Sequence, residues 1–204
     1  MKDPAPAPLP TFRLGAIPGA MPGKWVSRWR EQRPHQRIEL VPIEVAEQAE
    51  ALRSGRVDAA IARRPLAGDD LHVVDLYEEI PVVVASAESH LCAADELAPD
   101  DLAGEVLITP RDDVLGPLDL PTEEPAFAPV ATTEDAIATA ASGIGIVVVP
   151  MSLARLHHRR DADHRPLVGG PTSQVVLAWR RDRDAEDVQA LVGITRGRTA
   201  RSSR

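Results

Sequence analysis

Residues 51–62 read Ala-Leu-Arg-Ser-Gly-Arg-Val-Asp-Ala-Ala-Ile-Ala, the end of a helix followed by a strand. Gly55 stands where a helix C-cap glycine belongs, because glycine adopts the left-handed conformation without a steric penalty. Val57–Ala62 is short and nearly all apolar, which is typical of a strand covered on both faces of a parallel sheet. The stretch therefore predicts a helix that packs beside a buried parallel strand.

The same alternation of strand and helix extends upstream to residue 12. Phe12–Ile17 and Ile38–Ile43 have the composition of strands, and Pro22–Gln32 and Ala46–Ser54 place apolar residues on one helical face. Residues 12–62 are thus predicted to form a β-α-β-α-β unit. Such a unit indicates a parallel sheet with right-handed crossovers.

Downstream, a second α/β set begins and a last strand and helix follow it. The predicted strands are Ile80–Ala85, Val106–Thr109, Ala128–Thr132, Ile146–Val149 and Val175–Arg180. The predicted helical segments are Asp100–Leu102, Glu134–Ser142 and Ala185–Ile194, with loops at 111–125 and 157–164. We predict two lobes: lobe I is 12–82 plus 174–195, lobe II is 83–173, and the ends are a Pro-rich tail (1–11) and a basic tail (196–204).

The composition argues against several classes of protein. The 204 residues carry a net charge of −8, whereas proteins that grip DNA usually present a basic surface, so we expect no direct DNA binding. The one cysteine, Cys92, excludes an internal disulfide. The proline-rich start offers no apolar core for a secretion signal, and no run approaches the ~18 apolar residues of a membrane span. We expect a cytoplasmic protein.

Taken in order, the segments resemble the effector-binding domain of LysR-type transcription regulators over residues 12–194. The segments that carry the resemblance are Arg13–Ala16, Trp29–Pro34, Ala51–Ile61, Ala141–Pro150 and Ala178–Arg180. The most specific is Ala141–Pro150, Ala-Ser-Gly-Ile-Gly-Ile-Val-Val-Val-Pro, which is similar to the family's Ala-Gly-Leu-Gly-Ile…Leu-Pro segment.

The resemblance implies an α/β fold like that of type-2 periplasmic binding proteins. Two Rossmann-like lobes are joined by crossing strands, and a ligand cleft lies between them. It also implies a non-enzymatic sensor, without a cofactor, that binds a small-molecule effector such as a carboxylate or aromatic acid, and a homodimer. The family carries an N-terminal winged helix-turn-helix that does not stand in this sequence. The chain is therefore expected to be a stand-alone effector domain or a fragment of a longer regulator.

The effector-binding residues expected in lobe I follow the first two strands. One set is Pro18, Gly19 and Ala20, where backbone N–H groups near a helix start can bind an anion; the alternative is a tight turn that needs glycine. The other set is Val45 and Ala46. The family commonly has Ser or Thr at the position of Ala46. The alanine here lacks the hydroxyl that would form a hydrogen bond to the ligand.

The effector-binding residues expected in lobe II are Thr109, Arg111, Thr132 and Thr133. The guanidinium of Arg111 suits a carboxylate, because it offers bidentate donors; the alternative is a surface pair with a neighbouring aspartate. Thr132 or Thr133 also suits the N-cap of the following helix.

Competing hypotheses start from the same residues. The lack of hydroxyls at Ala46 and at Pro18–Ala20 favours a protein-interaction module that has lost ligand binding. The histidines at 157, 158 and 164 lack the spacing of a zinc site, and Cys92 with His90 forms no catalytic triad. Trp25 and Trp29 are expected in the core, with a dimer interface as the alternative.

Overall fold

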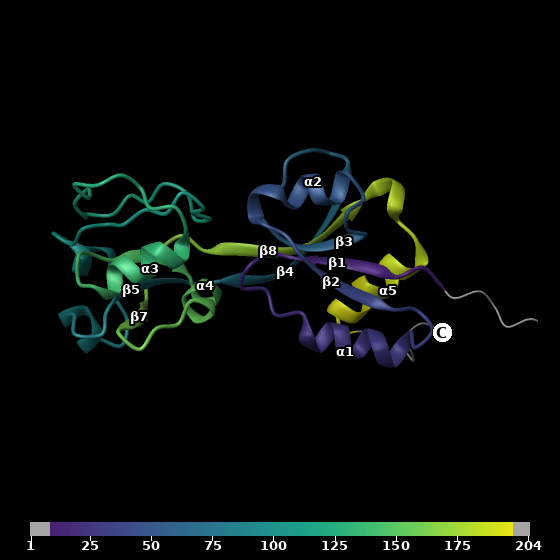
Figure 1. The fold of residues 1–204 in the computed structure, drawn as a ribbon, viewed down its shortest axis with the longest axis horizontal. Coiled ribbons are helices and arrows are strands. Elements are labelled where there is room, and N and C mark those ends of the chain that lie inside the picture. The colour runs from purple at the N-terminus through teal and green to yellow at the C-terminus, as the bar shows by residue number, and fades with distance from the viewer. Residues whose placement is uncertain (1–8, 198–204) are drawn as a thin grey trace, which may run out of the picture. The chain divides into compact units, whose positions relative to one another are not determined.

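The computed structural model describes residues 9–197, which form two compact units (Figure 1). Unit 1 holds the chain up to Leu76 and again from Val175, and unit 2 holds Tyr77–Gln174. Both boundaries fall inside strands, since β4 spans Leu71–Glu79 and β8 spans Ser173–Arg180. Most of the predicted Pro-rich and basic tails lies outside the described residues.

Unit 1 is built on one five-stranded sheet with the strand order β2-β1-β3-β8-β4. Strand β1 (Phe12–Ala16) pairs in parallel with β2 (Ile38–Pro42) and with β3 (Ala59–Arg63). This confirms the predicted parallel β-α-β-α-β unit. The returning strand β8 runs antiparallel to β3.

Helices cover both faces of this sheet. Figure 1 shows α1 (Gly23–Gln32) and α5 (Glu186–Thr195) on one face and α2 (Gln48–Arg53) on the other. Trp29 is fully buried in the core on the α1 and α5 side. Its ring centroid lies 4.7 Å from that of Phe12, and its indole N–H donates to the Gln36 carbonyl oxygen at 2.9 Å. Trp29 is therefore a core residue, as predicted.

Unit 2 is centred on β5 (Pro81–Ser86) in a three-stranded sheet of order β6-β5-β7. Strands β6 (Val147–Pro150) and β7 (Ala162–Pro166) both pair antiparallel with β5. The helices are α3 (Thr133–Ala141) and α4 (Met151–Leu156), with 3₁₀ turns at His90–Ala93 and Pro99–Leu102.

Two predicted strands of unit 2 are wrong. Val106–Thr109 makes only isolated bridges, Val106 with Glu123 and Leu107 with Ile146, and Ala128–Thr132 makes only one, Val130 with Pro110. Proline lacks the N–H that a ladder requires, and Pro110 follows the first segment while Pro129 interrupts the second. The predicted loop at 157–164 is also wrong in part, because its last residues begin β7.

Candidate functional site

The carboxyl ends of the parallel strands in unit 1 bring the candidate residues of lobe I together. Ala16 of β1 is in register with Pro42 of β2, so the segments that follow these two strands start side by side. From β1 the chain goes to β2 on one side of it and then to β3 on its other side, so the direction of the strand order reverses at β1. Open α/β sheets bind ligands at such a reversal of strand order. This edge is the candidate site of unit 1.

Pro18, Gly19 and Ala20 form a tight turn directly after β1. The Ala20 N–H donates to the Ile17 carbonyl oxygen at 3.1 Å, and Gly19 has a φ of +82°. Proline followed by a glycine with positive φ is the pattern of a type II turn. Helix α1 begins only at Gly23. The Ala20 N–H is therefore occupied within the turn, and contact of the turn with an effector stays a prediction.

Val45 and Ala46 lie in a 3₁₀ turn, Val45–Glu47, that precedes α2. The predicted α-helix starts two residues later, at Gln48. Val45 is half-buried against the unit 1 core, whereas Ala46 is exposed. The methyl group of Ala46 thus faces solvent without a polar atom to offer a ligand.

Arg63, the last residue of β3, lies at the same edge and was missed by the sequence prediction. It is 1% exposed, and the Gln48 side chain fixes its backbone. The Arg63 N–H donates to Gln48 Oε1 at 2.8 Å, and Gln48 Nε2 donates to the Arg63 carbonyl oxygen at 2.7 Å. Because side chains alternate along a strand, Arg63 shares with Ile61 the sheet face that α1 covers. The signal in the sequence was a cation directly after the apolar run Ala59–Ala62.

The candidate residues of unit 2 lie on two segments that hydrogen bonds hold together. The Arg111 N–H donates to the Val130 carbonyl oxygen at 2.9 Å. The buried hydroxyl residue Thr133 donates through Oγ1 to Asp112 Oδ1 at 2.9 Å. Thr109 precedes this junction and is exposed. The structure thus brings Thr109, Arg111 and Thr133 into one neighbourhood.

The threonine hydroxyls at the start of α3 already have partners. Thr132 Oγ1 accepts from the Asp135 N–H at 3.1 Å and donates to Asp135 Oδ2 at 2.9 Å, so the predicted N-cap is confirmed. Gly143, with a φ of +80°, follows the helix as predicted. Contact of Thr132 or Thr133 with a ligand stays a prediction.

Arg111 presents an exposed guanidinium that makes no ion pair with any of residues 9–197. The alternative, a pair with Asp112 or Asp113, is wrong. Asp112 accepts from Thr133, and the Asp113 carboxylate accepts from the N–H groups of Leu115 and Gly116 at 3.0 and 2.8 Å. Arg111 is thus available to an anion from solution.

The family is settled by comparison with known proteins. A family model described as the LysR substrate binding domain matches residues 7–200. The chain belongs to the LysR substrate-binding domain family. This confirms the resemblance found in the sequence.

Regulators are among the relatives of this LysR domain. It is 22% identical over 203 residues to the Hca operon transcriptional activator HcaR of Escherichia coli (strain K12), which covers 94% of this chain and 66% of that protein. It is 31% identical over 167 residues to the HTH-type transcriptional regulator CatR of Pseudomonas putida. This match covers 74% of this chain and 56% of CatR. The chain thus spans less than two thirds of the length of these relatives.

Solved structures share the fold of this LysR domain. The BenM effector binding domain with its effector benzoate superposes with a TM-score of 0.73 at 22% identity, over 92% of this chain and 91% of that one. The reduced form of the OxyR regulatory domain from Pseudomonas aeruginosa gives 0.68 at 22% identity, over 92% and 95%. These likenesses confirm the predicted fold class, that of LysR effector-binding domains.

Other site types find no support within residues 9–197. No group of three or more His, Cys, Asp or Glu side chains there is placed to hold a metal ion. No helix there is both long and apolar enough to cross a bilayer.

Cys92 is expected to react slowly as a nucleophile. Its thiol donates to the Ser86 carbonyl oxygen at 3.4 Å, and burial raises the pKa of the Cys92 thiol. Since the thiolate is the reactive form, we expect iodoacetamide to label the folded protein several-fold more slowly than the urea-unfolded chain at neutral pH. Mass spectrometry against time measures both rates, and equal rates would refute this expectation.

Proposed function

We propose that this LysR substrate-binding domain senses a small carboxylate or aromatic acid in the service of transcription regulation. The observation that carries the proposal is the buried Arg63 at the carboxyl edge of the parallel strands. Arginine keeps its charge in a protein interior and binds carboxylates in a bidentate geometry. The solved BenM domain, which shares the fold, holds benzoate as its effector.

Each unit has its own proposed effector contacts. In unit 1 they are Arg63, the turn Pro18–Ala20 and the Val45–Ala46 segment, all at the carboxyl edge of the sheet. In unit 2 they are Thr109 and Arg111, with Thr132 and Thr133 beside them. An effector acts by population shift, because it stabilises the conformation that binds it most tightly. We further propose that the domain functions as a homodimer in a cytoplasmic regulator and does not bind DNA by itself.

A binding screen of small carboxylates and aromatic acids tests the proposal by calorimetry. We expect Arg63→Gln and Arg111→Ala each to weaken the affinity of a binding acid about 10-fold or more, because each removes a charge-assisted hydrogen bond. Arg64→Gln and Arg155→Ala are the matched controls. Arg64 is the exposed neighbour of Arg63, and Arg155 is an exposed arginine of unit 2. Both controls should bind like the parent chain.

The second candidate is a protein-interaction module that has lost ligand binding. The exposed methyl of Ala46 and the occupied N–H of Ala20 favour it, because neither side chain offers a ligand a polar atom and the Ala20 N–H is bonded within the turn. This candidate predicts that no acid in the screen binds and that both arginine variants behave like the parent chain. That result would overturn the sensor proposal.

A further inference from the structure

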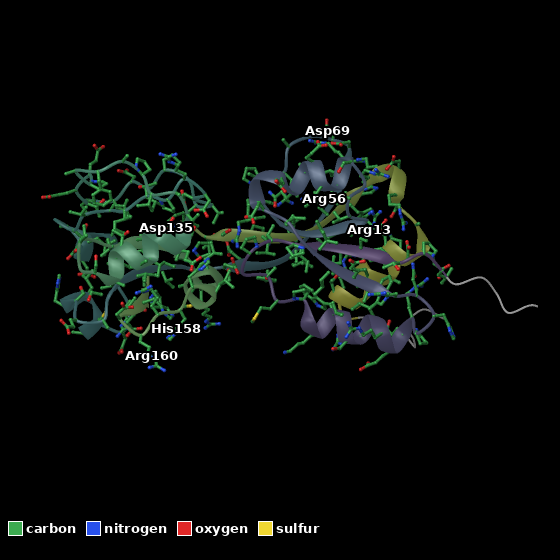
Figure 2. The ribbon with its side chains drawn as sticks, viewed as in Figure 1. Arg13, Arg56, Asp69, Asp135, His158 and Arg160 are labelled. Atoms are coloured by element: carbon green, nitrogen blue, oxygen red, sulfur yellow. The ribbon has the colours of Figure 1, made fainter. Side chains whose placement is uncertain are left out.

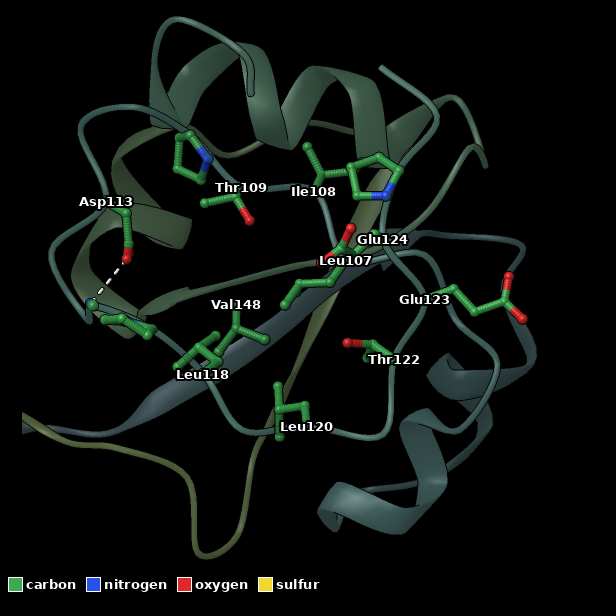
Figure 3. A pocket seen from close by; sticks show the side chains of 14 residues that line it. Leu107, Ile108, Thr109, Asp113, Leu118, Leu120, Thr122, Glu123, Glu124 and Val148 are labelled. Carbon is green, nitrogen blue, oxygen red and sulfur yellow. Dashed lines mark hydrogen bonds between the residues drawn. The ribbon is translucent and has the colours of Figure 1, made fainter. Parts of the chain in front are cut away.

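Unit 2 contains a cavity of about 520 Å³ whose lining shares only Thr109 with the proposed effector contacts. Leu107, Leu120 and Val148 form its apolar floor, and Thr109, Thr122 and Glu124 supply polar atoms around it (Figure 3). The volume lies within the range of about 300–1,000 Å³ found for small-molecule pockets. The cavity is therefore large enough for a ring-sized ligand.

Backbone hydrogen bonds fix the segment that forms the outer wall. The Glu123 N–H donates to the Glu105 carbonyl oxygen at 2.8 Å, and the Leu107 N–H donates to the Glu123 carbonyl oxygen at 2.9 Å. At the other end, the Asp113 carboxylate holds the turn at Gly116, whose φ is +78°. Leu118 and Leu120, which follow this turn, pack against the buried core of unit 2. The cavity is thus preformed, which reduces the entropy cost of binding.

Two hydroxyl groups inside the cavity have no partner among the described residues. Figure 3 shows the oxygens of Thr109 and Thr122 pointing into the open interior. Neither hydroxyl makes a hydrogen bond within residues 9–197. A hydroxyl both donates and accepts, so each can bind an alcohol or an amine.

The charged residues that line the cavity are all acidic, and Arg111 lies just outside the lining, next to Pro110. Its lining contains Asp113, Glu123 and Glu124 and no arginine, lysine or histidine. Asp113 is occupied by backbone N–H groups, and the Glu123 side chain points away from the interior (Figure 3). Negative surroundings disfavour a carboxylate and favour a neutral or cationic ligand.

We propose that this cavity is a second ligand site, selective for a neutral or cationic molecule with a compact apolar ring and a hydroxyl or amine group. The ring packs on the floor formed by Leu107, Leu120 and Val148. The polar group binds the hydroxyls of Thr109 and Thr122, and a cation gains from Glu124. The site therefore takes the charge class opposite to that proposed for Arg63 and Arg111.

Three probes that share one ring test this charge preference: benzyl alcohol, benzylamine and benzoate. Titrations followed by ¹⁵N chemical shifts should show saturable shifts of the lining amides, those of Leu107, Thr122 and Val148, with the alcohol and the amine. Dissociation constants of roughly 1 mM are expected for probes of this size. Benzoate should perturb the same amides at least about 10-fold more weakly.

Variants locate the binding. Leu120→Trp fills the cavity and should weaken the alcohol and the amine about 10-fold or more, whereas Leu156→Trp, at an exposed leucine of unit 2 outside the lining, should not. Thr122→Val keeps the shape and removes the hydroxyl, so it should weaken the alcohol about 2- to 10-fold.

The outcomes separate this site from the effector proposal. If benzoate shifts the resonances of the lining amides with a dissociation constant as low as that of benzyl alcohol, the charge preference is overturned. Lining amides that do not shift with either the alcohol or the amine would overturn the site. Chemical-shift changes with benzoate that are lost in the Arg63 or Arg111 variants report on the effector proposal. Benzyl alcohol and benzylamine still test whether the cavity binds a ligand.

Discussion

Replacing Trp29 with alanine is expected to destabilise unit 1 by about 3–5 kcal/mol, the usual range for truncating a buried aromatic residue. The Trp29 side chain is 0% exposed and packs with Phe12, Val26 and Leu191 in one apolar cluster. The substitution removes this packing and leaves a cavity between α1 and the sheet. It also removes the donor to the Gln36 carbonyl oxygen.

Urea unfolding followed by tryptophan fluorescence measures this effect. The other two tryptophans, Trp25 and Trp179, also belong to unit 1, so fluorescence still reports on that unit in the variant. Trp25→Ala is the matched control on the same helix. Trp25 is only half-buried at the edge of the cluster, and less than half of the Trp29→Ala effect is expected. Equal losses in the two variants would show that the burial of Trp29 does not set the stability of the unit.

The parallel half of the fold was predictable because its strands are short and mostly apolar and each of its helices has one apolar face. Strand β4 was not predicted, since Leu71–Glu79 mixes apolar residues with His72, Asp75 and two glutamates. It lies at the edge of the sheet, where polar residues are tolerated. Strand β7 escaped prediction for a similar reason, because its residues are half-buried and polar although they pair with β5.

The candidate site was predictable only where local sequence determines the backbone conformation. The turn at Pro18-Gly19 and the cap at Thr132 follow from local chemistry. Arg63 was missed because its burial arises from tertiary packing and not from neighbours in sequence. The cavity of unit 2 was missed for the same reason: residues 107–125 have no periodic pattern, and only backbone hydrogen bonds between distant segments, such as Leu107 with Glu123, give them their shape.

A partly buried ion pair in unit 1 gives a second large effect. Arg183 donates to both carboxylate oxygens of Asp187 at 2.8 Å, and the Gln36 amide donates to Asp187 Oδ2 at 3.1 Å. The Arg183 guanidinium, helped by Gln36, lowers the pKa of the Asp187 carboxyl to about 2, against the opposing effect of burial. Without Asp187, the Arg183 guanidinium stays partly exposed and keeps the Asp58 carboxylate at 3.5 Å. The lowering of the Asp187 pKa from 3.8 to about 2 corresponds to about 2–3 kcal/mol of stability.

Asp187→Ala is therefore expected to destabilise unit 1 by about 2–3 kcal/mol at neutral pH. The pKa of Asp187 is lower in the folded state than the unfolded value of 3.8. Its contribution to stability is thus complete above that value and is lost as the pH falls towards about 2.

The difference in unfolding free energy between the parent chain and Asp187→Ala should accordingly shrink as the pH falls through this window. Asp70→Ala is the control in the same unit, because Arg53 binds Asp70 in the same bidentate geometry at an exposed position. An exposed pair contributes at most about 1 kcal/mol, so this variant should stay close to the parent chain in urea unfolding at neutral pH. A loss as large as that of Asp187→Ala would mean that burial does not distinguish the two pairs. A difference for Asp187→Ala that is independent of pH would contradict the low pKa of its carboxyl.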